Sequence, residues 1–174
     1  MRLISTIVLF LTLFCFQLFA EELIVNSAGD RIYLRNKNME FVFSNTQTYK
    51  MYGMKYDSKQ MLPDGGIDTH PWEITYKGSA GENPVLKPNN GYYKGVATRI
   101  NDDKSTTLIF TWEMLLVADK THAVRMLLTL GEESDLAEWD IEADLPEEWI
   151  VANLNFPRIS VTRPQNAKAI LSAG

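Results

Sequence analysis

Five acidic residues lie close together in the sequence and are the first candidates for acid–base chemistry: Asp140, Glu142, Asp144, Glu147 and Glu148. Paired carboxylates cleave glycosidic bonds when burial or a like-charged neighbour keeps one of them protonated. The first three alternate with apolar residues, so they share the polar side of one predicted strand. Carboxylates on such a solvated side stay ionised. We therefore predict no catalytic residue among them.

Metal, nucleophile and phosphate sites have less support. The stretch "DGGIDTH" brings Asp64, Asp68 and His70 together, and such a set could hold a divalent ion. A Gly-rich turn whose Asp residues cap their own backbone explains the same residues. No serine lies in a G-x-S-x-G motif, and no Gly-rich phosphate loop occurs. We expect no metal and no cofactor.

Aromatic side chains are the remaining candidates, and they suit carbohydrate binding. Tyr92 and Tyr93 in "NNGYYKG", and Trp149 after the acidic turn, could stack on sugar rings. The competing interpretation is that adjacent tyrosines in a strand place one ring inside the protein. The other tryptophans fall on apolar strand faces and are predicted to be core residues: Trp72, Trp112 and Trp139.

Strands must position these side chains, because period-two alternation is the dominant pattern of the chain. Alternation runs through six segments: 31–36, 39–44, 70–77, 105–117, 123–130 and 147–156. The longest of them places five residues on one face: Leu108, Phe110, Trp112, Met114 and Leu116. Ile109 and Leu115 on its other face predict a central strand covered on both sides.

The stretch "LAEWDIEADL" admits two interpretations. As a strand, it turns Ala137, Trp139, Ile141 and Ala143 inward and the acidic residues outward. As a helix, it has only a thin apolar stripe after a possible capping box. We predict a strand, since strict alternation fits every position from 137 to 144.

Turn residues separate these segments, and no stretch forms a convincing amphipathic helix. The sequences "SAGD", "PDGG", "NDDK" and "GEES" supply the Gly, Asn and Asp that reversals need. Many strands at short spacing predict an all-β, antiparallel sandwich or barrel. We expect one domain over residues 21–174. The net charge of −5 argues against nucleic acid as a partner.

The first twenty residues predict export. Arg2 precedes the apolar run "LISTIVLFLTLFCFQLFA", and two glutamates follow it. This is the pattern of a secretory signal peptide, with cleavage after Ala20. The alternative is an uncleaved membrane anchor, because the run nearly reaches the ~20 residues that span a bilayer. Cys15, the single cysteine, lies in this segment, so the mature chain would hold no disulfide.

The order of the predicted strands resembles a module found at the start of secreted bacterial glycoside hydrolases. The resemblance is carried by "LRNKNMEFVFSNTQTYKMYGMKYDSKQMLP", then "PWEITYK", "TTLIFTWEML", "EWDIEADL" and "NLNFPRIS". That module is similar to the galactose-mutarotase-like supersandwich. The resemblance covers nearly all of residues 22–174. It rests on strand patterns together with "PWE" and "FPRI", and it implies a β-sandwich fold for the chain.

The resemblance also implies where catalysis takes place. In such enzymes a (β/α)₈ barrel that carries the catalytic carboxylates follows the sandwich. The segment "RPQNAKAILSAG" looks like the start of the passage into a barrel, so we interpret Gly174 as an interruption. No catalytic residue can be carried over to this chain.

We therefore expect a secreted or periplasmic, non-catalytic N-terminal module of a carbohydrate-active enzyme. Its partners would be its own downstream barrel and an oligo- or polysaccharide. After signal cleavage we expect no contact with a membrane. Two alternatives remain. One is a free-standing carbohydrate-binding module, and the other is an envelope protein that binds a partner through a sheet edge or apolar patch.

Overall fold

The structure is a computed structural model that describes residues 24–63, 66, 70–77, 81, 83–117, 120–144 and 150–159. The predicted signal peptide, its cleavage point after Ala20 and Gly174 lie outside these residues. Across the part of the chain that is described, no helix is long and apolar enough to cross a membrane.

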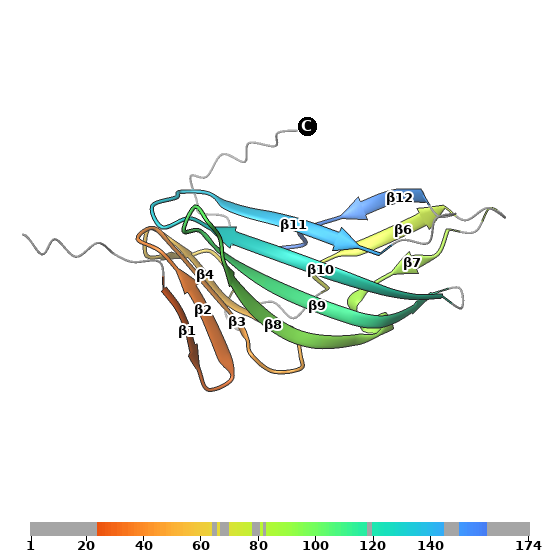
Figure 1. The fold of residues 1–174 in the computed structure, drawn as a ribbon, viewed down its shortest axis with the longest axis horizontal. Coiled ribbons are helices and arrows are strands. Elements are labelled where there is room, and N and C mark those ends of the chain that lie inside the picture. The colour runs from red at the N-terminus through yellow and green to blue at the C-terminus, as the bar shows by residue number, and fades with distance from the viewer. Residues whose placement is uncertain are drawn as a thin grey trace, which may run out of the picture.

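The described residues form three antiparallel sheets joined by short turns (Figure 1). The five-stranded sheet contains β1 (Ile24–Ala28), β2 (Arg31–Arg35), β3 (Met39–Ser44), β4 (Met51–Tyr56) and β5 (Lys59–Gln60), in that order. The four-stranded sheet has the order β11 (Ala137–Ala143), β10 (Lys120–Leu130), β9 (Thr106–Val117) and β8 (Tyr92–Ile100). The three-stranded sheet has the order β12 (Ile150–Asn155), β6 (Glu73–Lys77) and β7 (Val85–Leu86). The short 3₁₀ helix η1 (Pro88–Asn90) leads from β7 into β8.

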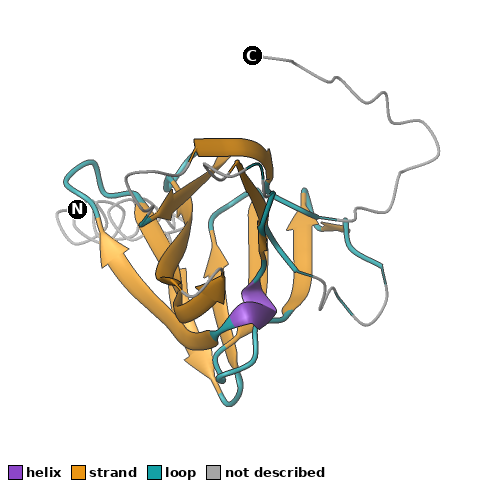
Figure 2. Cartoon of the chain, turned by 90° about the vertical axis from the view of Figure 1, so that its right-hand side faces the viewer, coloured by secondary structure: helices purple, strands orange, loops and turns teal. Residues whose placement is uncertain are grey.

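The four-stranded sheet forms one layer, and the other two sheets pack against different lengths of it (Figures 1 and 2). The five-stranded sheet meets it where Phe43 of β3 contacts Phe110 of β9, with ring centroids 4.7 Å apart. The three-stranded sheet meets it where Tyr76 of β6 stacks on His122 of β10, at 5.9 Å. The predicted all-β, antiparallel β-sandwich is therefore confirmed.

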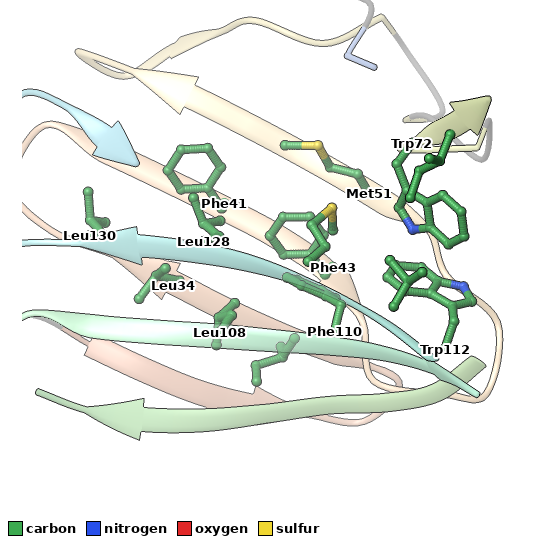
Figure 3. Close-up of a cluster of buried hydrophobic side chains, with 14 of the residues drawn as sticks. Leu34, Phe41, Phe43, Met51, Trp72, Leu108, Phe110, Trp112, Leu128 and Leu130 are labelled. Carbon is green, nitrogen blue, oxygen red and sulfur yellow. The ribbon is translucent and has the colours of Figure 1, made fainter. Parts of the chain in front are cut away.

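One cluster of buried side chains serves all three sheets (Figure 3). Phe41 and Phe43 from β3 lie against Phe110 and Trp139 of the four-stranded sheet. Farther along, Trp72 lies against Trp112, with centroids 5.6 Å apart and ring planes at 84°. Trp72 and Trp112 are essentially inaccessible to solvent and Trp139 is half-buried, as the alternation predicts.

The acidic stretch from 137 is the strand β11, as predicted. Its apolar residues are half-buried and alternate with exposed acidic residues along the whole strand. Strand β11 pairs with β10 in unbroken register, from Leu130–Ala137 to Val124–Ala143. Because it is an edge strand, its inward side chains are covered less completely than those of β9 and β10.

The prediction that Met114 and Leu116 face inward with Leu108, Phe110 and Trp112 is wrong. Strand β9 carries a bulge there, because two residues lie opposite one between the pairs Trp112–Val124 and Leu115–His122. Met114 in the bulge has a φ of 53°. An extra residue reverses the alternation, so Leu115 is buried while Met114 and Leu116 are exposed.

Asn36, in the turn between β2 and β3, fastens two sheets together. Its Nδ2 donates hydrogen bonds of 2.8 Å to the carbonyl oxygens of Gly131 and Ser134, in the turn between β10 and β11. Its Oδ1 accepts from the backbone N–H groups of Asn38 and Met39. One amide therefore holds its own turn and ties the five-stranded sheet to the four-stranded sheet.

Replacing Phe43 by alanine tests the shared core. We expect Phe43→Ala to lower the free energy of unfolding by about 3–5 kcal/mol, because it leaves a cavity between two sheets. Urea unfolding followed by circular dichroism measures the loss. Tyr92, an exposed residue at the start of β8, supplies the control. Tyr92→Thr should change the free energy of unfolding by no more than about 0.5 kcal/mol. A loss below about 1 kcal/mol for Phe43→Ala would contradict the shared core.

The Asn36 bridge is tested by the isosteric change Asn36→Asp. The carboxylate keeps both acceptor bonds but loses both donors and places a negative charge against two carbonyl oxygens. We expect a loss of about 1–3 kcal/mol in the free energy of unfolding. Lys37→Ala, at the adjacent exposed position, is the control. If Asn36→Asp unfolded at the wild-type urea midpoint, the bridge would have no role in stability.

Candidate functional site

A cleft of about 220 Å³ opens at the junction of the three sheets. The turn between β3 and β4 supplies one wall, and the residues that lead into β6 supply a second. Helix η1 and the four-stranded sheet complete the cleft. The lining residues are Gln47, Thr48, Tyr49, His70, Pro71, Pro88, Asn89, Gly91, Tyr93 and Trp112.

Three aromatic rings from different elements form the apolar part of the cleft. Tyr93 lies 5.1 Å from Trp112 between ring centroids, with planes at 39°. Tyr49 lies 5.7 Å from Trp112 and 6.1 Å from Tyr93, and its ring is nearly perpendicular to that of Tyr93. Trp72 supports Trp112 from the core side, and Figure 3 shows this tryptophan pair beyond Phe43 and Phe110. The cleft is thus an extension of the core.

Polar groups complete the lining, and none of the described residues that line the cleft is Asp, Glu, Lys or Arg. Gln47, Thr48 and Asn89 provide amide and hydroxyl groups at exposed positions. The Tyr93 hydroxyl oxygen is buried and has no hydrogen-bond partner among the described residues. Buried polar groups almost always have a partner in native proteins. This hydroxyl oxygen is closed off from solvent and lies on the core side of the cleft.

The two tyrosines stay protonated at neutral pH. Burial raises the pKa of the Tyr93 phenol well above its ordinary value. Burial also raises the pKa of the Tyr49 phenol, and the charge that Tyr93 would carry raises it further. Both phenols are therefore neutral groups, each able to donate one hydrogen bond.

Gly91 brings helix η1 close to β9. A Cβ atom at Gly91 would lie 2.6 Å from the carbonyl oxygen of Glu113 and 2.8 Å from the Cα atom of Leu115. Only glycine fits this approach without displacing the backbone of β9. Asn89 of this helix and Tyr93 of β8 both line the cleft.

The structure separates the three predicted sugar-stacking residues. Tyr93 points inward and lines the cleft, whereas Tyr92 is 67% exposed and does not line it. The two tyrosines thus occupy opposite sides of β8, as the pleat requires. Trp149 lies outside the described residues.

Three of the five acidic residues singled out in the sequence lie among the described residues. Asp140, Glu142 and Asp144 are exposed, and Glu142 forms a 2.8 Å ion pair with Arg125. Glu147 and Glu148 lie outside the described residues.

The two histidines of the sequence lie in different environments. His70 lines the cleft, while His122 is buried against Tyr76, and its Nδ1 lies 3.3 Å from the carbonyl oxygen of Asp144. Asp64 and Asp68 lie outside the described residues. Elsewhere in the described part, no group of three or more His, Cys, Asp or Glu residues could hold a metal ion.

Glu73 is the centre of a charged cluster, and it lies two residues after Pro71, which lines the cleft. Its Oε2 lies 3.1 Å from Lys87 Nζ and 3.5 Å from Arg158 Nη1, and Asn155 Nδ2 donates to its Oε1. The Arg158 backbone N–H also donates to the Pro71 carbonyl oxygen at 2.8 Å. The "PWE" and "FPRI" motifs therefore meet in space. The Lys87 hydrogen bond, assisted by Arg158, holds the pKa of Glu73 below its ordinary value.

Sequence reasoning missed most of the cleft. Gln47, Thr48 and Tyr49 lie in a turn between strands, and Asn89 lies in a short proline-bounded helix. No local pattern marks such residues as neighbours of Trp112. Their proximity depends on how three sheets pack, which alternation alone does not specify.

Comparison with known proteins gives one informative relative. The chain is 42% identical over 160 residues to a protein of Bacteroides thetaiotaomicron named "Putative glycoside hydrolase". The alignment covers 92% of this chain but 24% of the relative, so the chain spans about a quarter of that protein's length. No family model matches the chain. The chain is thus related to one segment of a much longer protein.

The Glu73 cluster predicts a pH-dependent contribution to stability. Because the pKa of Glu73 is lowered in the folded state, its contribution is present above the ordinary value of 4.5 and is lost as the pH falls through the folded-state pKa. Glu73→Gln should therefore destabilise the chain at neutral pH, and the difference from wild type should shrink in acid. Urea unfolding measured between neutral pH and strongly acidic pH gives both curves.

Glu138→Gln, on the exposed side of β11, is the matched control and should follow the wild-type pH dependence. A constant difference between Glu73→Gln and wild type across the whole pH series would show that the charge on Glu73 is not what stabilises the fold.

Proposed function

We propose that this chain is a β-sandwich module of a glycoside hydrolase and that it performs no catalysis itself. The observation that carries the proposal is the 42% identity to one segment of a relative whose name describes that activity. Three quarters of the relative lie outside the alignment, which leaves room for a separate catalytic domain. The module's role would be to support that domain and shape one rim of its substrate cleft.

The exposed positions of the described acidic residues support a non-catalytic role. A general acid needs a raised pKa, which burial or a close carboxylate provides. Asp140 and Glu142 lie on the solvent side of an edge strand, Asp144 is exposed directly after it, and Glu142 pairs with an arginine.

Two finer parts of the proposal rest on the sequence pattern. The first is that the sandwich is of the galactose-mutarotase-like type and precedes a (β/α)₈ barrel. The contact between the "PWE" and "FPRI" segments, in which the Arg158 N–H donates to the Pro71 carbonyl oxygen, supports it, because these two motifs carry the resemblance. The second is export by the predicted signal peptide, which would place the module in the periplasm or outside the cell.

The cleft favours a second, compatible function, which is carbohydrate binding by the module itself. An aromatic cleft whose described lining carries amide groups, a histidine and no Asp, Glu, Lys or Arg suits a polyhydroxylated ligand. This function does not require the catalytic domain, so the chain by itself can be tested for it.

Hydrolysis assays with a panel of p-nitrophenyl glycosides test the first proposal. The Bacteroides thetaiotaomicron relative should release p-nitrophenol from at least one substrate, whereas this chain should release none at the same molar concentration. A variant of the relative that lacks the segment aligned with this chain should be less stable or inactive. Turnover by this chain alone, in proportion to its concentration, would contradict the non-catalytic role.

A further inference from the structure

We propose that the side of β12 that faces away from β6 is a docking edge in a longer protein. An extended segment of that protein, from outside the stretch that this chain represents, would pair with β12 and cover Val151 and Leu154. The choice of partner rests on the proposed function, in which this chain is one module of such a protein. The place of the edge rests on the exposure, register and charge of β12 and β11.

Two apolar side chains of β12 lie on the core side of their sheet without being covered. In the register with β6, Val151 lies opposite Tyr76 and Leu154 lies opposite Ile74. Residues that lie opposite each other share one face of the sheet, and the extra residue at the bulge, Ala152, keeps Val151 and Leu154 on the same side. Tyr76 and Ile74 are buried, whereas Val151 is 40% and Leu154 is 44% exposed. The cover over this face therefore ends between β6 and β12.

The facing sheet is covered less completely along the same border. Tyr76 of β6 stacks on His122 of β10, and β7 contacts β9, so the order β12-β6-β7 matches the order β11-β10-β9 across the two layers. Phe156, directly after β12, reaches Trp139 of β11, with ring centroids 6.5 Å apart, and Figure 1 shows both strands at one border. The inward residues of β11 are only half-buried. Apolar side chains of both layers therefore remain partly accessible at this border.

The two strands of the border differ in how they resist pairing with a further strand. Edge strands in natural proteins avoid such pairing with charged side chains or with proline. Strand β11 carries Glu138, Asp140 and Glu142 at exposed positions. Strand β12 has the sequence IVANLN, with no charged residue and no proline, and β6 is its one partner among the described strands. The second side of β12 is therefore suited to accept an extended segment through backbone hydrogen bonds.

The length of the relative indicates where this segment comes from. Three quarters of that protein lie outside the part that aligns with this chain. A segment from the same polypeptide is tethered, so it binds at a high effective concentration. The six residues of β12 then suffice, whereas a separate protein needs a larger interface to bind stably.

A second copy of this chain fits the border less well. In a symmetric pair the same surface patch meets itself. Two copies would therefore bring the exposed Glu138 and Asp140 carboxylates of both chains to one border, and each chain carries a net charge of −5. Like charges at close range repel each other, which disfavours this pairing.

Hydrogen–deuterium exchange of this 174-residue chain and of the intact Bacteroides thetaiotaomicron relative tests the proposal. An alignment of 160 residues within 174 necessarily includes residues 150–155, so β12 has a counterpart in the relative. The amide groups of β12 should exchange quickly in this chain. Those of the counterpart strand should exchange at least about tenfold more slowly in the relative, because a strand paired on both sides opens less often. Peptides from β10 should be slow in both proteins and serve as the reference.

Leu154→Glu places a charge on the side of β12 that the added segment would cover. Made at the aligned position of the relative, it should raise exchange of the counterpart strand to the rate seen for β12 in this chain. Asn153→Glu is the matched control, because Asn153 lies opposite Thr75 on the outer side of the sheet. Its counterpart in the relative should leave the exchange rate unchanged. Circular dichroism checks that both variants fold, and if one does not, the comparison of the two wild-type proteins decides.

Three results would each overturn the docking edge. The first is equal exchange of β12 and its counterpart in the relative. The second is slow exchange of β12 in this chain at every protein concentration, which would show that the chain covers this strand itself. The third is protection of β12 that rises with the concentration of this chain, together with a dimer in sedimentation equilibrium, which would assign the edge to a second copy.

These outcomes are distinguishable from failure of the proposed function. If the relative hydrolyses a glycoside while its counterpart strand exchanges as quickly as β12, the docking edge is wrong and the role as an enzyme module stands. If the counterpart strand is protected while the relative hydrolyses no glycoside, the docking edge stands and the glycoside hydrolase assignment fails.

Discussion

One layer of aromatic side chains holds the described part of this protein together, because its three sheets share one core cluster. The four-stranded sheet is long enough to be covered by two others, and Phe110 and Trp112 of β9 face one neighbour after the other. The core-facing side chains of β9 stay buried where the two covering sheets meet. The cleft opens at that junction, and its aromatic walls continue the ring contacts of the core.

Four consecutive residues, His70 to Glu73, show how closely fold and site are coupled. His70 and Pro71 line the cleft, Trp72 is buried against Trp112, and Glu73 pairs with Lys87 and Arg158. A shift of residues 70–73 would therefore move a wall of the cleft, part of the core and the charged cluster together. The three residues of the "PWE" motif therefore lie in three different environments: the cleft, the core and the charged cluster. Strand alternation predicts only a buried or an exposed side, so it does not explain why these three residue types occur together.

The sequence predicted the strands well, because period-two alternation reports directly on which side of a sheet is buried. The strand at 137–144 and the inside–outside division of Tyr92 and Tyr93 followed from that rule. The rule failed at Met114, where a bulge set by pairing with β10 reversed the pattern. It also gave no sign of the cleft, because Tyr49 reaches Trp112 only through packing between distant segments.

The most direct test of the shared layer is whether the protein unfolds as one unit. Urea unfolding should be followed by far-UV circular dichroism, which reports on all strands, and by tryptophan fluorescence, which reports on the Trp72–Trp112 pair. Replacing Trp139 and Trp149 by phenylalanine leaves Trp72 and Trp112 as the only fluorescent tryptophans. If one aromatic layer supports all three sheets, the two transitions of this variant will coincide in midpoint and slope. A fluorescence transition at lower urea than the loss of strand signal would show that the three-stranded sheet and the cleft end are held independently, and it would contradict this account.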